Sequence, residues 1–171
     1  MTAMMIDPTP SPARERFRSA MAGLSAGVNV VTTDGPAGRA GLTVSAVCSV
    51  SDTPPTMLVC IKRSSSGHDV FEGNRRLCIN VLGSGHEDVA RVFAGGTGVS
   101  GAERFASGQW QDRAGVPVLV GAAASVLGRI SEIKAQGSHS VVFVEVEGVV
   151  LNEDAGGLVY FQRRFHPIGG D

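Results

Sequence analysis

The sequence predicts a mostly β protein, built as a β-barrel with a few short helices. Short runs of β-branched and aromatic residues recur at close intervals along the chain. Turn signals such as Asp34-Gly35-Pro36 and Asp52-Thr53-Pro54-Pro55 separate consecutive runs. Helical periodicity is confined to a few short segments. Because a parallel α/β sheet needs a helix between successive strands, these observations favour a barrel.

The expected strands are residues 28–33, 41–50, 57–62, 77–82, about 121–134, 141–151 and 158–162. A helix is expected to begin at Ser11-Pro12, where serine caps and proline occupies the first turn. Its apolar residues at helical spacing are Phe17, Ala20, Met21 and Leu24, and Gly23 or Gly27 ends it.

Two more helices are expected between the strands. Ser84-Gly85-His86-Glu87 has the pattern of a capping box and would open a helix over 86–94. Its buried residues would be Val89, Ala90, Val92 and Phe93, and it would end at Gly95. A shorter helix after Gly67 would turn Val70 and Phe71 inward.

Composition limits the function. The chain has 171 residues, 43% of them hydrophobic and 18% charged, with a net charge of −1. We expect a single domain over 11–171 preceded by a mobile tail at 1–10. The charge gives no general attraction to nucleic acid or anionic lipid. The N-terminus lacks a signal-peptide pattern and no apolar run reaches membrane-spanning length, which favours a cytoplasmic protein.

The cysteines and histidines do not have the spacing of a metal site. Cys48, Cys60 and Cys78 are too far apart in sequence for a metal or redox motif. Cys48 and Cys60 fall in apolar strand patterns, so we expect buried, reduced thiols. The histidines are unpaired, which predicts no metal site.

The segment 41–50 has an unusual strand pattern. Alternation places Thr43, Ser45, Val47, Ser49 and Ser51 on one face and Leu42, Val44, Ala46, Cys48 and Val50 on the other. The first face carries small hydroxyl groups where a strand normally has charges for water or bulk for a core. This pattern predicts a surface that receives a ligand.

Two loops resemble nucleotide sites to different degrees. Residues 96–101 match GxGxxG, but they follow a helix instead of a strand, so we interpret them as a flexible surface loop. Lys62 and Arg63, followed by Ser64, Ser65, Ser66 and Gly67, link a strand to a short helix. Cations, hydroxyls and helix N–H groups suit a phosphate, while the alternative is a serine-rich turn in which Ser66 only caps the helix.

The residues alone do not decide the role of two further parts of the chain. His139 follows Gly137-Ser138 at the mouth of an apolar strand, where it is either a solvated rim residue or a ligand contact. Arg163-Arg164-Phe165-His166 is either an ordinary basic end or a source of cations for an anionic ligand.

Longer stretches of the chain resemble a known family. TDGPAGRAGLTVSAVCSVSDTPPTMLVC, GNRRLCINVL, ARVFAGGTGV, GSHSVVFVEV and LVYFQRRFHP are similar to short-chain flavin reductases, the partners of two-component flavin monooxygenases. The resemblance runs from Phe17 to Pro167. Within the family it is strongest to reductase components of 4-hydroxyphenylacetate 3-monooxygenases, and next to the reductases of pyrimidine degradation.

The resemblance implies a flavin-binding split β-barrel, a homodimer, and FMN or FAD with NADH as cofactors. It places Thr43, Val44, Ser45 and Ala46 against the isoalloxazine ring, and Ser49 and Ser51 towards the ribityl chain. Cys60, Lys62, Ser64, Ser65 and Ser66 match ribityl and phosphate contacts. Gly137 and His139 match a Gly-Asp-His motif implicated in nicotinamide binding, although here Ser138 replaces the aspartate.

The expected activity is therefore NADH-dependent reduction of flavin for a partner monooxygenase. The flavin and the nicotinamide carry this chemistry, so the absence of a recognisable triad or carboxylate pair agrees with it. Two alternatives of other kinds remain: a non-enzymatic FMN-binding protein, and an oxidase of a phosphorylated pyridoxal-type substrate on a related barrel.

Overall fold

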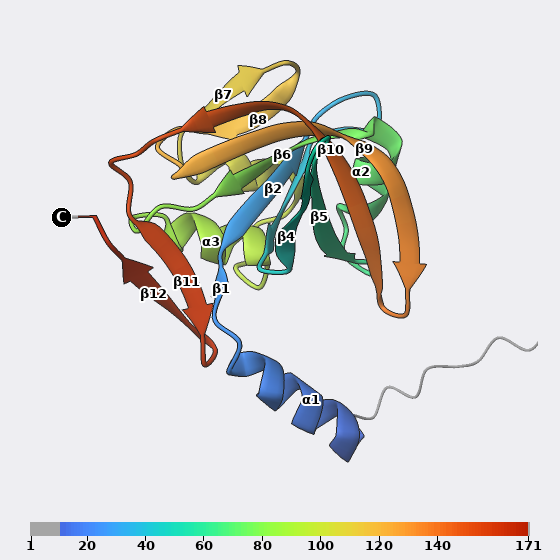
Figure 1. Cartoon of the computed structure of the whole chain (residues 1–171), viewed down its shortest axis with the longest axis vertical. Helices are drawn as coiled ribbons and strands as arrows, with labels where there is room; N and C mark the ends of the chain where they lie inside the picture. The colour runs from blue at the N-terminus through green and yellow to red at the C-terminus, as the bar shows by residue number, and fades with distance from the viewer. Residues whose placement is uncertain (1–10, 171) are drawn as a thin grey trace, which may run out of the picture.

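The computed structural model describes residues 11–170 and contains one large antiparallel sheet rolled into an open barrel (Figure 1). The predicted mobile tail at residues 1–10 lies outside the described residues. The sheet has seven strands in the order β3-β2-β6-β9-β10-β5-β4. They are β2 (Asn29–Thr33), β3 (Ala40–Val44), β4 (Val47–Asp52), β5 (Pro55–Lys62), β6 (Arg76–Val81), β9 (Ala124–Gln136) and β10 (His139–Leu151). The prediction of a mostly β protein is confirmed.

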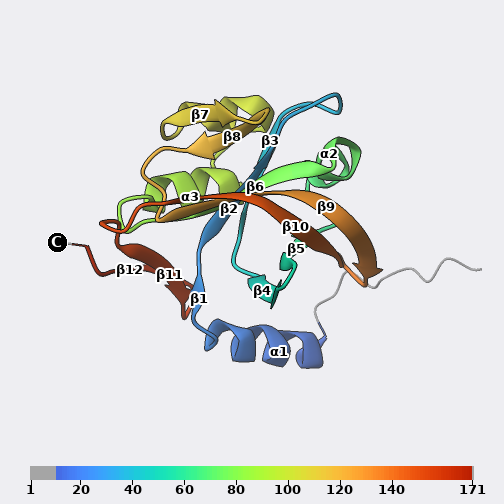
Figure 2. The ribbon, with the colours of Figure 1, turned by 45° about the horizontal axis from the view of Figure 1, so that its top comes forward.

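Smaller elements surround this barrel (Figure 2). A three-stranded sheet contains β1 (Ala26–Gly27), β11 (Gly157–Phe161) and β12 (Arg164–Ile168), and a hairpin contains β7 (Trp110–Arg113) and β8 (Val116–Leu119). The helices are α1 (Pro12–Ala22), α2 (His68–Asn74), α3 (Glu87–Ala94) and the 3-10 helix η1 (Gly101–Ala106). Sequence patterns did not predict β1, β7, β8, β12 or η1, all short elements. No helix within residues 11–170 is both long and apolar enough to cross a membrane.

The prediction of a single strand over 41–50 is wrong, because the structure divides this segment into β3 and β4. β3 pairs with β2 and β4 pairs with β5, so the two halves lie at opposite edges of the sheet. Leu42 and Val44 pack on the core before the break, and Val47 packs on it afterwards. The inward-facing parity therefore changes at Ser45-Ala46, and the five hydroxyl-face positions do not share one face.

The core lies inside the curve of the sheet and continues beneath α3. One cluster combines Val31, Val59, Ile79 and Val142, with Phe71 of α2 closing it. A second cluster lies under α3; it contains Val28, Leu82, Phe93, Leu119 and Leu158. Between the strands, the buried side chain of Asn80 forms four hydrogen bonds within 3.2 Å, to backbone groups of Val30 and Leu119 and to the hydroxyls of Thr32 and Ser125.

The helices differ in detail from their predictions. Residues 12–22 form α1 as expected, but none of its residues is buried, and Phe17 is 64% exposed. The proposed capping box is absent: α3 begins at Glu87 and its N-cap is His86, whose ring Nδ1 accepts a 3.2 Å hydrogen bond from the Gly83 N–H. Val92 is only half-buried, since it lies at the margin of the face that packs on the barrel.

The expectation of buried thiols holds for Cys78 and fails for Cys48, which is exposed on the edge strand β4. Its neighbour Val47 faces the core, so the alternation turns Cys48 outward. Cys60 is half-buried, and burial is the main cause that raises the pKa of its thiol, with the nearby Cys48 as the second. All three cysteines are free.

Candidate active site

The break between β3 and β4 creates an exposed stretch of backbone at Ser45-Ala46. The N–H of Val47 donates to the Ser45 carbonyl oxygen at 3.0 Å, and the N–H of Cys60 donates to the Ala46 carbonyl oxygen at 2.9 Å. Ser45 and Ala46 are both exposed, and neither amide N–H donates a hydrogen bond to another of residues 11–170. The break therefore offers two small side chains and two free N–H donors to a ligand.

The turn after β5 packs against β3, the strand that leads into this break. Gly67 is buried, and a Cβ atom added to it would lie 3.4 Å from the Cβ of Ala40 and 3.5 Å from the Cγ of Leu42 on β3. Within the turn, the Ser65 hydroxyl donates to the Lys62 carbonyl oxygen at 2.7 Å, which leaves Ser64 and Ser66 as the exposed hydroxyls. The N-cap of α2 is Gly67, so Ser66 does not cap this helix.

The segment 137–139 meets the same turn from the other side. His139 of β10 pairs with Lys62 of β5, and the Arg63 N–H donates to the Ser138 carbonyl oxygen at 3.0 Å. His139 is exposed, and its Nδ1 lies 2.9 Å from the Ser138 hydroxyl. The structure thus brings together three segments that are far apart in sequence: 43–46, 60–66 and 137–139.

Ser49 and Ser51 lie away from this group. β4 runs antiparallel to β5, with Val47 opposite Val59 and Ser51 opposite Thr56, so the strand leads away from Lys62. The Ser51 hydroxyl accepts a hydrogen bond from the Thr53 N–H at 3.1 Å, within the turn that follows. These two serines are therefore placed on the edge of the barrel and not between the break and the turn.

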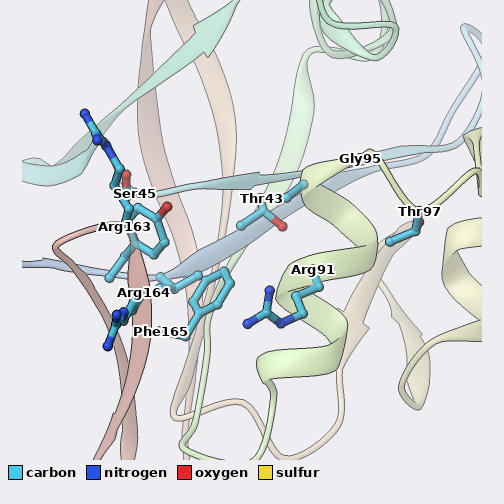
Figure 3. Close-up of a pocket in the computed structure, with 12 residues that line it drawn as sticks. Thr43, Ser45, Arg91, Gly95, Thr97, Arg163, Arg164 and Phe165 are labelled. Carbon is cyan, nitrogen blue, oxygen red and sulfur yellow. The ribbon is translucent and has the colours of Figure 1, made fainter. Parts of the chain in front are cut away.

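A cleft of about 670 Å³ opens on the other side of Ser45 (Figure 3). One wall is formed by α3 and the loop after it, and the opposite wall by the hairpin β11–β12. Its lining residues are Val28, Thr43, Ser45, Arg91, Ala94, Gly95, Gly96, Thr97, Tyr160, Arg163, Arg164 and Phe165. Thr43 does not offer its hydroxyl proton to a ligand, because that group donates to the Ala90 carbonyl oxygen at 2.7 Å.

The cleft combines aromatic rings with positive charge. The rings of Tyr160 and Phe165 lie 5.1 Å apart, and the Arg91 guanidinium lies 5.1 Å from the centre of the Phe165 ring. Arg91 also pairs with Glu87 at 2.6 Å, which fixes it along α3. The sequence left open whether residues 163–166 are an ordinary basic end or contact an anionic ligand; the folding of the β11–β12 hairpin against α3 brings Arg163 and Arg164 to a cleft.

The GxGxxG segment is an exposed loop, as interpreted, yet Gly96 and Thr97 also line the cleft. Its glycines Gly96, Gly98 and Gly101 have φ of 84°, 78° and 54°, a conformation that favours glycine. The glycines of the motif therefore allow the backbone conformation of this loop, and the motif is not a strand-to-helix phosphate site.

His68, Asp69 and Glu72 of α2 bring side-chain ligand atoms within 4.8 Å of one another, a grouping that the sequence analysis did not anticipate. Both ring nitrogens of His68 are already engaged: Nδ1 lies 2.9 Å from Asp69 Oδ1, and Nε2 lies 2.9 Å from the Ser140 hydroxyl. His68 thus attaches α2 to β10, and Asp69 is almost fully exposed.

Comparison with known proteins identifies the family. A family model described as the flavin reductase like domain matches residues 21–169. The chain belongs to this family. The match covers the break at Ser45-Ala46, the turn after β5 and both walls of the cleft.

Relatives of this flavin reductase domain match it along nearly its full length. It is 53% identical over 158 residues to the 4-hydroxyphenylacetate 3-monooxygenase reductase component of Pseudomonas aeruginosa, covering 92% of this chain and 93% of the relative. It is 48% identical to an FMN reductase (NADH), RutF, of Ancylobacter novellus, and the match covers 94% of this chain and 88% of the relative. A solved structure of a flavin reductase from Haemophilus somnus has a TM-score of 0.85 at 35% identity, covering 90% and 98%.

The predicted split barrel is confirmed by this structural similarity. The hydrogen-bonded ladders leave β3 and β4 as separate edges of the seven-stranded sheet, and the chain itself connects them at Ser45-Ala46.

Proposed function

We propose that this protein is an NADH-dependent flavin reductase that supplies reduced flavin to a separate monooxygenase. The observation that carries the proposal is the meeting of three segments at the break between β3 and β4. It provides free N–H donors at Ser45 and Ala46, a cationic serine turn at Lys62–Ser66, and an exposed histidine at 139. Two similarities support the proposal: the chain is 53% identical to a 4-hydroxyphenylacetate 3-monooxygenase reductase component and 48% identical to an FMN reductase (NADH).

The isoalloxazine ring lies against residues 43–46 in this proposal. A flat tricyclic ring needs a flat surface of small side chains, which Ser45 and Ala46 supply. Their two free N–H groups would donate to the N5 and O4 edge of the ring. Donors to this edge stabilise the negative charge that develops when the ring is reduced.

The phosphate of the flavin lies at the turn after β5. Lys62 supplies the positive charge, and Ser64 and Ser66 supply hydroxyl donors that the fold does not use internally. Cys60 lies between this turn and Ala46, beside the path of the ribityl chain. We leave Ser49 and Ser51 out of the site, because β4 carries them in the opposite direction.

His139, with Gly137 before it, is proposed to position the nicotinamide. His139 is exposed at the end of β10 and pairs with Lys62, so a ligand stacked on the flavin is within its reach. When both cofactors are bound, they supply the chemistry, a hydride passing from nicotinamide C4 to flavin N5. Residues 43–46 and His139 would hold the two rings so that the reacting atoms come within about 3–3.5 Å, and no acid, base or covalent nucleophile would be required of the protein.

The partner oxygenase is proposed to be a 4-hydroxyphenylacetate 3-monooxygenase, and the alternative is a pyrimidine-degradation oxygenase, as for the RutF relative. We also propose a homodimer of a single domain over 11–171, in the cytoplasm. Leu58, Val141 and Phe143 support the dimer: they alternate with the core residues Val59 and Val142, so they face outward, yet they are apolar.

A steady-state assay tests the proposal. Oxidation of NADH is followed at 340 nm with FMN, FAD or riboflavin added separately, and each assay is repeated with NADPH. Saturable NADH oxidation that depends on added flavin is the expected result. Tight FMN binding without NADH oxidation would instead establish a non-enzymatic flavin-binding protein, and oxygen-dependent turnover of pyridoxine 5′-phosphate would establish the oxidase alternative.

A further inference from the structure

The turn of the β11–β12 hairpin has a sequence that its backbone does not favour. Phe161 pairs with Arg164, so Gln162 and Arg163 are the two central residues of the turn. Both have positive φ, 48° and 61°. Two-residue turns with two positive φ angles strongly prefer Asn-Gly, Asp-Gly or Gly-Gly, because residues with larger side chains are strained there. The backbone therefore does not explain why an arginine occupies this position.

The two arginines of the hairpin also lack acidic partners. Arg39, Arg76, Arg91 and Arg129 each pair with a carboxylate. Within residues 11–170, Arg163 makes only a 3.5 Å contact with the Ser19 hydroxyl, and Arg164 makes no hydrogen bond or ion pair with its side chain. Both are exposed, and both line the cleft.

The position of these arginines is that of an anion site at the mouth of an aromatic cleft. Figure 3 shows Arg91 directed towards Phe165 from α3, while Arg163 and Arg164 extend from the opposite wall to different sides of the hairpin. Within residues 11–170, no ion pair holds either of the two hairpin arginines. Glu87 is the one carboxylate that pairs with any of these three arginines among residues 11–170.

We infer that Arg163 and Arg164 bind the pyrophosphate of NADH when its nicotinamide lies on the flavin at the break beside Ser45. This inference rests on the proposed function and adds a second anion site to it. The turn at Lys62–Ser66 takes the flavin phosphate that follows the ribityl chain, and the hairpin takes the two linked phosphates of NADH. Arginine suits this task because its planar donors match phosphate oxygens in pairs. A cleft of about 670 Å³ has room for a nucleotide half.

The test compares the double variant Arg163→Gln/Arg164→Gln with the parent protein. The KM for NADH at saturating FMN should rise at least tenfold, while kcat, the Kd of FMN and the melting temperature stay within experimental error. Arg163→Lys/Arg164→Lys should recover part of the affinity, and high salt should reduce the difference between variant and parent.

Arg113→Gln is the matched control, since Arg113 is exposed on β7 away from the cleft, and it should behave as the parent. An unchanged KM for NADH would overturn the inference, even with full flavin reductase activity. An equal loss of FMN affinity would also overturn it, because the hairpin would then bind the mononucleotide phosphate. If the parent protein itself oxidised no NADH, the proposed function would fail instead.

Discussion

The N–H of Cys60 donates a 2.9 Å hydrogen bond to the carbonyl oxygen of Ala46, and this bond marks where the chain leaves one edge of the barrel for the other. Before Ala46 the chain is paired with β2, and after it the chain is paired with β5. A strand that changes partners has a stretch with no neighbour on one side. This stretch is the origin of the free N–H groups at Ser45 and Ala46 and of the flavin site proposed for them.

The serine turn should distinguish FMN from riboflavin, which lacks the phosphate. Replacing Ser64 and Ser66 with alanine removes two hydroxyl donors, each contributing about 1.5–3 kcal/mol when bonded to a charged phosphate. The Kd of FMN should therefore rise at least tenfold, while the Kd of riboflavin should change little. Fluorescence titration of both flavins measures this ratio. Ser131→Ala, at an exposed position on β9, is the control. An unchanged FMN-to-riboflavin ratio would remove the phosphate from this turn.

His139 and His68 should respond to alanine in opposite ways. His139 is exposed, and within residues 11–170 its side chain lies within hydrogen-bond distance of the Ser138 hydroxyl alone, so His139→Ala should slow flavin reduction or raise the NADH requirement without changing the melting temperature. His68 bridges Asp69 and Ser140, so His68→Ala should cost about 1–3 kcal/mol of stability. Stopped-flow reduction and thermal unfolding of both variants separate the two roles. A lowered melting point with unaltered reduction kinetics in His139→Ala would make this residue structural.

His86 should make the stability depend on pH. Burial lowers the pKa of His86 below its usual value, and the fold also uses its Nδ1 as the acceptor for the Gly83 N–H. The unfolded chain then binds a proton more readily than the folded protein, so stability is present above the unfolded pKa of about 6.5 and decreases as the pH falls below it. Glu87 and Asp88 in the first turn of α3 and Asp154 of the adjoining loop are the nearby acidic groups.

Melting temperatures of the parent and His86→Asn between pH 8 and pH 5 measure this contribution. Asparagine retains an oxygen acceptor near the Gly83 N–H and does not titrate in this range. The parent should lose more stability than the variant as the pH falls. Parallel curves for the two proteins would show that His86 does not contribute.

Asn80 should be among the most sensitive positions of the fold. It is fully buried and satisfies groups on β2 and β9 and in the β8 region with one side chain. Asn80→Ala leaves several buried groups without partners, and we expect a loss of about 3 kcal/mol or more. Urea unfolding compares it with Asn152→Ala, an exposed position where the change should stay within about 0.5 kcal/mol. A loss of less than about 1 kcal/mol in Asn80→Ala would contradict this role.

Strands in which buried and outward-facing residues alternate regularly were predictable from the sequence. Residues such as Val59 and Val142 alternate with outward-facing neighbours, and their strands appear close to the expected bounds. The break at Ser45-Ala46 was not predictable, because alternation on either side of it looks continuous and only tertiary pairing shows the change of parity. The exposed Cys48 follows from the same change.

Some parts of the candidate site were also predictable from the sequence, and others were not. The turn at Lys62–Ser66 was recognisable because charge, hydroxyls and glycine occur together in sequence. The cleft was not, because Arg91 and Phe165 are 74 positions apart and meet only when the hairpin folds against α3. Phe17 and Met21 show the reverse: their spacing correctly predicts a helix, but periodicity alone does not show what covers an apolar face, and the helix ends before Leu24, which was expected to belong to it.

The central claim is that flavin lies on the break at Ser45 and is reduced there by NADH. Anaerobic stopped-flow mixing of NADH with protein and FMN, followed by the loss of flavin absorbance at 450 nm, tests it most directly when the parent is compared with Ser45→Leu. The parent should reduce flavin with saturable dependence on NADH, while Ser45→Leu should keep its melting temperature and lose at least tenfold in FMN affinity, because the larger side chain displaces the ring. Flavin binding and reduction in Ser45→Leu equal to those of the parent would contradict the claim.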